Sequence, residues 1–114
     1  MIQIKRVYDP AMPGDGIRIL AERLWPRGMK KEDAKLDDWL KEVAPSTELR
    51  KWFSHDPARW SDFQQRYWSE LDQNPEVWQP IVESEKKDQV TLLFSSHDAE
   101  YNNVVALKRY LEER

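Results

Sequence analysis

The run Val90-Thr91-Leu92-Leu93-Phe94-Ser95 constrains the fold of this chain more than any other segment. It is short and almost continuously apolar, which is typical of a strand covered on both faces of a sheet. A second run of this kind begins at Ile17, and we expect a strand from Ile17 to Leu24. Strands covered on both faces need helices on both sides, so these runs predict an α/β fold.

Two other segments near the N-terminus are predicted to form a strand and a turn. Ile2 to Tyr8 is predicted to be the first strand, ended by Asp9-Pro10, and Met12 to Gly16 has the composition of a turn. Residues 29–44 are ambiguous. Their apolar residues have helical spacing, whereas a brief helix at 31–35 followed by a strand at 39–43 fits the same residues.

Helix signals occupy the middle and the end of the chain. Ser46, Asp56-Pro57 and Asn74-Pro75 are typical helix starts, and residues 98–103 offer several capping side chains. Pro80 is expected to kink the helix that contains it. The apolar stripes that follow these starts are Leu49, Trp52 and Phe53; Trp60, Phe63, Tyr67 and Leu71; Val77, Trp78, Ile81 and Val82; and Val104, Leu107, Tyr110 and Leu111. Residues 1–114 are thus predicted to form a single α/β domain, with a mostly parallel sheet of about three to four strands packed with helices.

Composition excludes several classes of protein. The chain has no cysteine, which removes thiol catalysis, disulfides and cysteine-based metal sites. Its two histidines lie far apart, so neither a metal nor another cofactor is expected. A net charge of −3 argues against wholesale nucleic-acid binding. No apolar stretch reaches the roughly 20 residues that span a bilayer, and the N-terminus lacks the apolar core of a signal peptide. We therefore expect a cytoplasmic protein without membrane contact.

Two polar loops are predicted to form a binding site. Arg23-Leu24-Trp25-Pro26-Arg27-Gly28 follows the second strand, and residues 95–103 follow the last one. If these strands are parallel neighbours, their carboxyl ends meet at the edge of the sheet where α/β proteins bind ligands. Arginine grips phosphate or carboxylate through paired hydrogen bonds, so a small anionic ligand is expected. The candidate ligand-binding residues are Arg23, Trp25, Arg27, Ser95, Ser96, Asn102 and Asn103.

Structural roles are open for the same residues. The polar side chains of residues 95–103 also suit the capping of the helix that follows, and the arginines also suit an ion pair with an aspartate such as Asp98. Ser-His-Asp occurs at 54–56 and again at 96–98, but adjacent residues cannot form a catalytic triad. Each aspartate has a simpler role as the N-cap of the next helix. If the protein is an enzyme, His97 and Asp98 are the candidate catalytic residues, with His97 as the acid or base.

Several motifs run along the whole chain: Gly16-Ile17-Arg18-Ile19-Leu20, Arg23-Leu24-Trp25-Pro26-Arg27-Gly28, Ala44-Pro45-Ser46, Leu49-Arg50-Lys51-Trp52-Phe53, His55-Asp56-Pro57, and Leu92-Leu93-Phe94-Ser95 with Asn102-Asn103. This motif string closely resembles the bacterial YeaO-like family, known as domain of unknown function number 488. The resemblance covers essentially the whole chain and implies a small α/β fold without an established reaction. Some branches of the wider family carry a Cys-His-Arg motif, which this chain lacks.

Three functions compete. The favoured one is the binding of an anionic small molecule, with or without catalysis, in a pocket walled by Trp25 and Trp52. The second is a nucleotide- or nucleic-acid-binding module that combines the arginines with aromatic stacking. The third is an interaction or regulatory protein that presents tryptophan-rich helices of residues 52–78 to a partner, although six tryptophans also suit the core of a small domain. The sequence leaves open the oligomeric state and whether the protein is an enzyme.

Overall fold

Four parallel strands form one sheet in the order β1-β4-β2-β3. The computed structural model describes residues 1–113. The strands are β1 (Ile2–Arg6), β2 (Ile17–Leu20), β3 (Asp38–Trp39) and β4 (Val90–Phe94). In the middle of the sheet, Leu92 of β4 lies opposite Ile4 on one side and Ile19 on the other. The predicted α/β class and the parallel sheet are confirmed.

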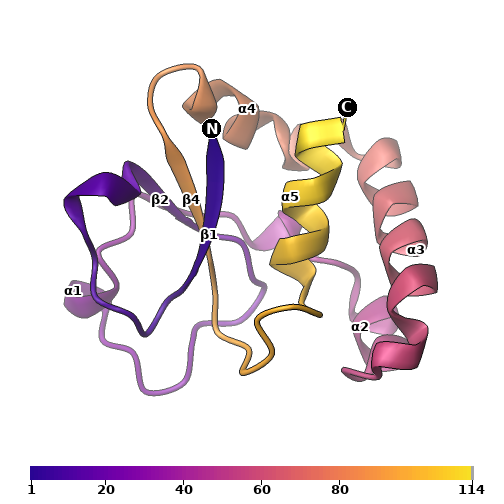
Figure 1. Ribbon diagram of the computed structural model, residues 1–114. Coiled ribbons are helices and arrows are strands. Elements are labelled where there is room, and N and C mark those ends of the chain that lie inside the picture. Colours follow the sequence, from indigo (N-terminus) through magenta and orange to yellow (C-terminus); the bar gives the residue numbers. More distant parts are fainter. Residues whose placement is uncertain (114) are drawn as a thin grey trace.

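Helices cover both faces of this sheet. They are α1 (Lys31–Ala34), α2 (Thr47–Phe53), α3 (Trp60–Gln73), α4 (Gln79–Glu85) and α5 (Asn103–Glu113). In Figure 1, α1 lies to the left of the strands, whereas α2, α3 and α5 lie to their right. Among residues 1–113, no helix combines the length and the apolar character that crossing a membrane requires.

Alternation along the strands divides the core between the two faces. Ile19 and Leu92 point to the face that packs against α2, α3, α4 and α5, in the larger hydrophobic cluster. Leu20 and Leu93, one residue further along, belong to a smaller cluster that includes Ala34 of α1 and is packed by Trp39. This pattern follows from the period of two residues in a strand. It explains why β2 and β4 are mostly apolar, with Arg18 and Thr91 as their polar residues.

The helix starts follow the capping rules at Ser46 and Asp56 but not at Asn74, whose side chain caps no N–H group and donates instead to the carbonyl of Glu70. Ser46 accepts a hydrogen bond from the backbone N–H of Leu49, and Asp56 accepts one from Ala58, so both predicted N-caps are confirmed. Pro80 does not kink a helix. A short 3-10 helix, Pro75–Val77, precedes α4, and Pro80 then occupies the first turn of α4, where its missing N–H leaves no intrahelical bond unmade.

Several boundaries differ from the prediction: β1 ends at Arg6 rather than Tyr8, and β4 ends at Phe94 rather than Ser95. Strand β2 ends at Leu20 rather than Leu24, because residues 21–29 leave the sheet as an irregular loop. The ambiguous segment is α1, then the two-residue strand β3, then a 3-10 helix at Lys41–Val43. The alternative of a brief helix followed by a strand is therefore the better description, although the strand is shorter and starts one residue earlier.

Candidate functional site

A cavity of about 760 Å³ opens at the carboxyl ends of β2 and β4. These strands are parallel neighbours, so the loops that follow them lie side by side, at the bottom of the view in Figure 1. The end of α2 supplies a third wall. All nine candidate site residues line this cavity: Arg23, Trp25, Arg27, Ser95, Ser96, His97, Asp98, Asn102 and Asn103.

Glu22 ties the two loops together. Its carboxylate accepts a hydrogen bond of 2.6 Å from the hydroxyl of Ser95 and one of 3.1 Å from the backbone N–H of Ser95. Asn103 adds a second connection, since its side-chain amide donates to the backbone carbonyl of Ala21 at 3.1 Å. The polar groups of Ser95 and the amide of Asn103 therefore hold the wall of the cavity in place.

The guanidinium of Arg23 is fixed by the segment that precedes α2. One terminal nitrogen donates to the carbonyls of Ala44 and Pro45, at 3.2 and 3.4 Å, and the other lies 3.6 Å from a carboxylate oxygen of Glu42. Arg23 thus forms a structural ion pair, as the alternative expected, but its partner is Glu42 rather than Asp98. Its Nε is buried, and it is the one buried side-chain nitrogen or oxygen of residues 1–113 that lacks a hydrogen-bond partner.

Arg27 has a different environment. Its backbone carbonyl accepts a hydrogen bond of 2.8 Å from the hydroxyl of Tyr8, which anchors the loop. Its side chain is exposed, and no ion pair or side-chain hydrogen bond links it to another of residues 1–113. The arginine is therefore available for a ligand at the mouth of the cavity.

Asp98 and Asn102 shape the loop after β4. Asp98 accepts hydrogen bonds from the backbone N–H groups of Tyr101 and Glu100, at 2.9 and 2.8 Å, and these bonds hold the pKa of Asp98 below its ordinary value. Asn102, not Asp98, caps α5, because its side-chain oxygen accepts from the N–H groups of Val104 and Val105. The prediction that Asp98 caps the next helix is corrected: it caps the turn that leads to that helix.

Ser96 and His97 lie between Ser95 and Asp98, which are held by the hydrogen bonds described above. The hydroxyl oxygen of Ser96 accepts from the backbone N–H of Asp98 at 3.1 Å. Arg6 holds the backbone of this stretch by donating to the carbonyls of Ser96 and His97, at 3.2 and 2.7 Å. The His97 side chain is exposed at the rim of the cavity.

Sequence reasoning missed the contribution of α2 to the cavity. Arg50 and Lys51 from its last turn line it, as do Ser54 and His55, which follow the helix in left-handed backbone conformations with φ of 49° and 57°. Such conformations are uncommon for residues other than glycine and cluster at functional sites. The adjacent pair Arg50-Lys51 was visible in the sequence, but nothing in a linear pattern places the end of α2 beside β2 and β4.

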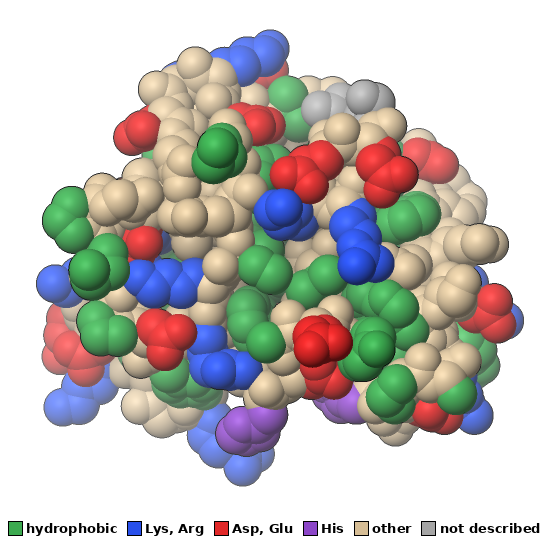
Figure 2. All heavy atoms as spheres, viewed as in Figure 1, with side chains coloured by type: hydrophobic (Ala, Val, Ile, Leu, Met, Phe, Trp, Pro, Cys, Tyr) green, Lys and Arg blue, Asp and Glu red, His purple; other side chains and the backbone are tan. Residues whose placement is uncertain are grey.

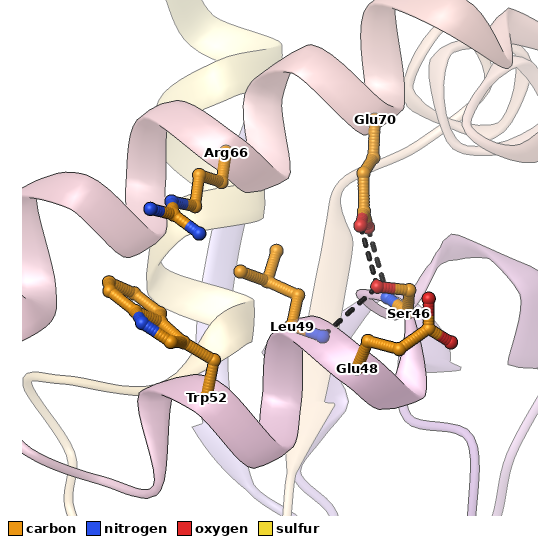
Figure 3. A pocket seen from close by; sticks show the side chains of 6 residues that line it. All are labelled: Ser46, Glu48, Leu49, Trp52, Arg66 and Glu70. Atoms are coloured by element: carbon orange, nitrogen blue, oxygen red, sulfur yellow. Dashed lines mark hydrogen bonds between the residues drawn. The ribbon is translucent and has the colours of Figure 1, made fainter.

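Trp52 does not wall this cavity. It lines a separate hollow of about 330 Å³ between α2 and α3, where the Arg66 guanidinium carbon lies 4.3 Å from the centre of one of its rings. Figure 3 shows this hollow, with Glu70 bonded to the N-cap Ser46 at its far end. The expectation that Trp25 and Trp52 face one pocket is therefore wrong for Trp52.

The tryptophan-rich helices do not present an apolar surface. Trp60 and Trp78 are buried, and the exposed large hydrophobic side chains of residues 1–113 are Met1, Tyr8, Met12 and Leu24, all outside residues 52–78. The hypothesis of a tryptophan-rich partner surface loses its main support. The described residues also contain no group of three or more His, Asp or Glu side chains that could hold a metal ion.

Comparison with known proteins identifies relatives. The family model DUF488-N3i, described as "Inactive DUF488-N3 subclade", matches residues 1–114. The "Uncharacterized protein YeaO" of Escherichia coli is 46% identical over 110 residues, which is 96% of each chain. The "Uncharacterized protein Rv3073c" of Mycobacterium tuberculosis is 46% identical over 70 residues, covering 61% of this chain and 59% of its own. No solved structure matches the chain significantly.

Proposed function

The chain belongs to the DUF488 family, in the subclade described as inactive, and we propose that it binds a small anionic molecule at the carboxyl ends of β2 and β4 without transforming it. The observation that carries this proposal is the convergence of Arg27, Arg50 and Lys51, all exposed, with Arg23 on one cavity. Arg27 has no ion pair within residues 1–113 and would hold the anion at the mouth of the cavity.

The arrangement favours binding over proton transfer. Asp98 is engaged by two backbone N–H groups, and its lowered pKa keeps it ionised and unsuited to donate a proton near neutrality. His97 is exposed, and no carboxylate among the described residues hydrogen-bonds its ring. In this proposal His97 contacts the ligand and Asp98 maintains the loop that presents it.

A thermal-shift screen of phosphorylated and carboxylated metabolites tests the proposal. A ligand present at 100 times its Kd stabilises the native state by about 2.7 kcal/mol, which raises the Tm by several degrees. Arg27→Ala should abolish the shift for any compound that binds at the site, whereas Arg109→Ala should leave it unchanged, because Arg109 lies on α5 and bonds to Gln64 away from the cavity. A screen in which no anion shifts the Tm, or in which both variants respond like wild type, contradicts the proposal.

A further inference from the structure

Burial separates the cavity into a floor and a rim. The floor consists of apolar side chains that are almost fully buried, with Phe53 5% and Phe63 1% exposed and Pro26 also buried. The rim consists of exposed basic side chains, namely Arg27, Arg50, Lys51, His55 and His97. Figure 2 shows both histidines at the lower edge of the molecule, the edge at which the strands end, with basic side chains beside one of them.

The rim carries more positive charge than a single carboxylate needs. Arg23, Arg27, Arg50 and Lys51 contribute four positive charges to the cavity, against two negative charges from Glu22 and Asp98. Both carboxylates are occupied, Glu22 by Ser95 and Asp98 by backbone N–H groups. The protein as a whole is acidic, with a net charge of −3, so this concentration of positive charge is local. It matches a ligand with two negative charges, as a phosphate monoester has near neutrality.

The floor is aromatic and larger than an inorganic anion requires. Phe53 stacks on Phe63 with ring centroids 4.3 Å apart, and Trp25 on the opposite loop packs edge to face with Trp39 at 5.2 Å. Phe53 and Phe63 have almost no surface open to the cavity, whereas Trp25 is half-buried and lines it, so a ligand ring would stack on Trp25. A cavity of about 760 Å³ also lies within the range of sites for ring-bearing organic ligands.

From the basic rim and the aromatic wall at Trp25 we infer that the ligand is an aromatic phosphate monoester, bound with its ring against Trp25 and its phosphate at Arg23 and Arg27. This inference rests on the proposed anion site and adds to it the class of the ligand. Arg50 and Lys51 then serve as specificity residues for the second negative charge, because they face the same rim from α2. An aryl phosphate and a nucleoside monophosphate share this chemistry.

Isothermal titration of the full chain at low ionic strength tests the inference with four compounds. Phenyl phosphate should bind at least about tenfold more tightly than inorganic phosphate, since ring burial is worth at least about 1.4 kcal/mol, and benzoate should bind more weakly than phenyl phosphate by a similar factor. Adenosine monophosphate distinguishes a nucleotide ligand from an aryl phosphate ligand. If the protein binds it more tightly than phenyl phosphate, the ligand is a nucleotide, and if it binds it more weakly, the ligand is an aryl phosphate. Equal affinity for phenyl phosphate and inorganic phosphate overturns the ring assignment and leaves the anion site intact.

Variants distinguish the inferred ring contact from the proposed anion site on which it rests. Trp25→Leu should remove most of the preference for phenyl phosphate while leaving the affinity for inorganic phosphate unchanged, because only the aromatic wall is altered. Lys51→Ala should weaken phenyl phosphate more than benzoate, and Lys87→Ala, an exposed lysine outside the cavity, should have no effect. If Trp25→Leu does not fold, the compound series on wild type still decides. Failure of every compound to bind in an Arg23-dependent manner would overturn the anion site itself.

Discussion

The carboxylate of Glu22 accepts two hydrogen bonds from Ser95, one from the hydroxyl at 2.6 Å and one from the backbone N–H at 3.1 Å. Glu22 follows the end of β2 and Ser95 follows the end of β4, so this contact joins two loops that are 73 residues apart in the chain. The geometry of the cavity depends on this contact together with the Asn103–Ala21 bond, because both hold the loop that carries Arg23 and Arg27 beside the end of β4.

Replacing Glu22 therefore weakens the fold at the site. Glu22→Ala removes a charged acceptor from two donors in Ser95 and should lower the free energy of unfolding by about 2 kcal/mol. The matched control is Glu42→Ala, since the Glu42 side chain is 77% exposed and its pair with Arg23 is long, so its loss should cost under about 0.5 kcal/mol. Urea denaturation measures both values. Equal losses for the two variants would show that Glu22 does not tie the loops together.

Tyr67 supports the site from below. Its hydroxyl is buried and donates to the carbonyl of Val43 at 2.5 Å, next to the Ala44 and Pro45 carbonyls that hold Arg23. Tyr67→Phe leaves the Val43 carbonyl without this donor and should cost about 1–2 kcal/mol in urea denaturation. Tyr8→Phe, which removes an exposed hydroxyl, should cost less than about 0.5 kcal/mol. A Tyr67→Phe protein as stable as wild type would contradict this role.

Gly16 is required where β2 begins beside the residue that precedes β4. Its φ is +67°, and a Cβ at this position would lie 2.2 Å from the carbonyl oxygen of Gln89, which accepts a hydrogen bond from Ile17. Gly16→Ala should therefore destabilise the protein by about 3 kcal/mol or more, through backbone strain and a steric clash. Gly14→Ala is the control: no atom lies within 4 Å of its added Cβ, and the expected change is below about 1 kcal/mol. Comparable urea midpoints for the two alanine variants would refute the argument.

The buried cluster of Lys5, Asp15 and Arg18 on the α1 side of the sheet gives an acid-sensitive contribution to stability. Burial alone would raise the pKa of Asp15, but hydrogen bonds from the Met12 N–H, Lys5 and Arg18 outweigh it, and the net pKa is lowered. A lowered pKa in the folded state contributes stability above the unfolded value of about 3.9, and this stability is lost as the pH falls through the folded value.

Asp15→Asn tests that contribution. At pH 7 the variant should lose about 3–5 kcal/mol, because the buried Arg18 is left without its carboxylate. Below pH 4 the difference from wild type should shrink, since wild type loses the same interaction on protonation. Asp9→Asn, at an exposed position, should follow the wild-type pH dependence throughout. A difference between Asp15→Asn and wild type that stays constant from pH 7 to pH 2.5 would be inconsistent with titration of Asp15.

Much of the fold was predictable because the signals are local. The apolar runs at 17–20 and 90–94 read as buried strands, and Ser46 and Asp56 as N-caps, since both patterns depend on residues close together in sequence. The end of β2 was not predictable in this way. Residues 21–24 continue a partly apolar pattern, whereas the contact of Glu22 with Ser95 that holds this loop joins residues far apart in sequence.

The candidate site was likewise predictable only where its signals are local in the sequence. The loops after β2 and β4 follow from the rule that parallel strands gather their carboxyl ends at one edge. The contribution of Arg50, Lys51 and His55 depends on how α2 docks against the sheet, which a linear pattern does not encode. The misplacement of Trp52 has the same cause, because the helix periodicity does not say which neighbour its side chain meets.

The most direct test of an anion site is the NMR signal of the Arg27 Nε–H group, identified by its absence in Arg27→Lys. Saturating inorganic phosphate should shift this signal strongly, because the exposed Arg27 guanidinium lines the cavity and has no ion pair within residues 1–113. The Nε–H signal of Arg109, outside the cavity, serves as the internal control and should not move. A phosphate titration that leaves the Arg27 signal in place, or that moves Arg27 and Arg109 equally, would contradict the account.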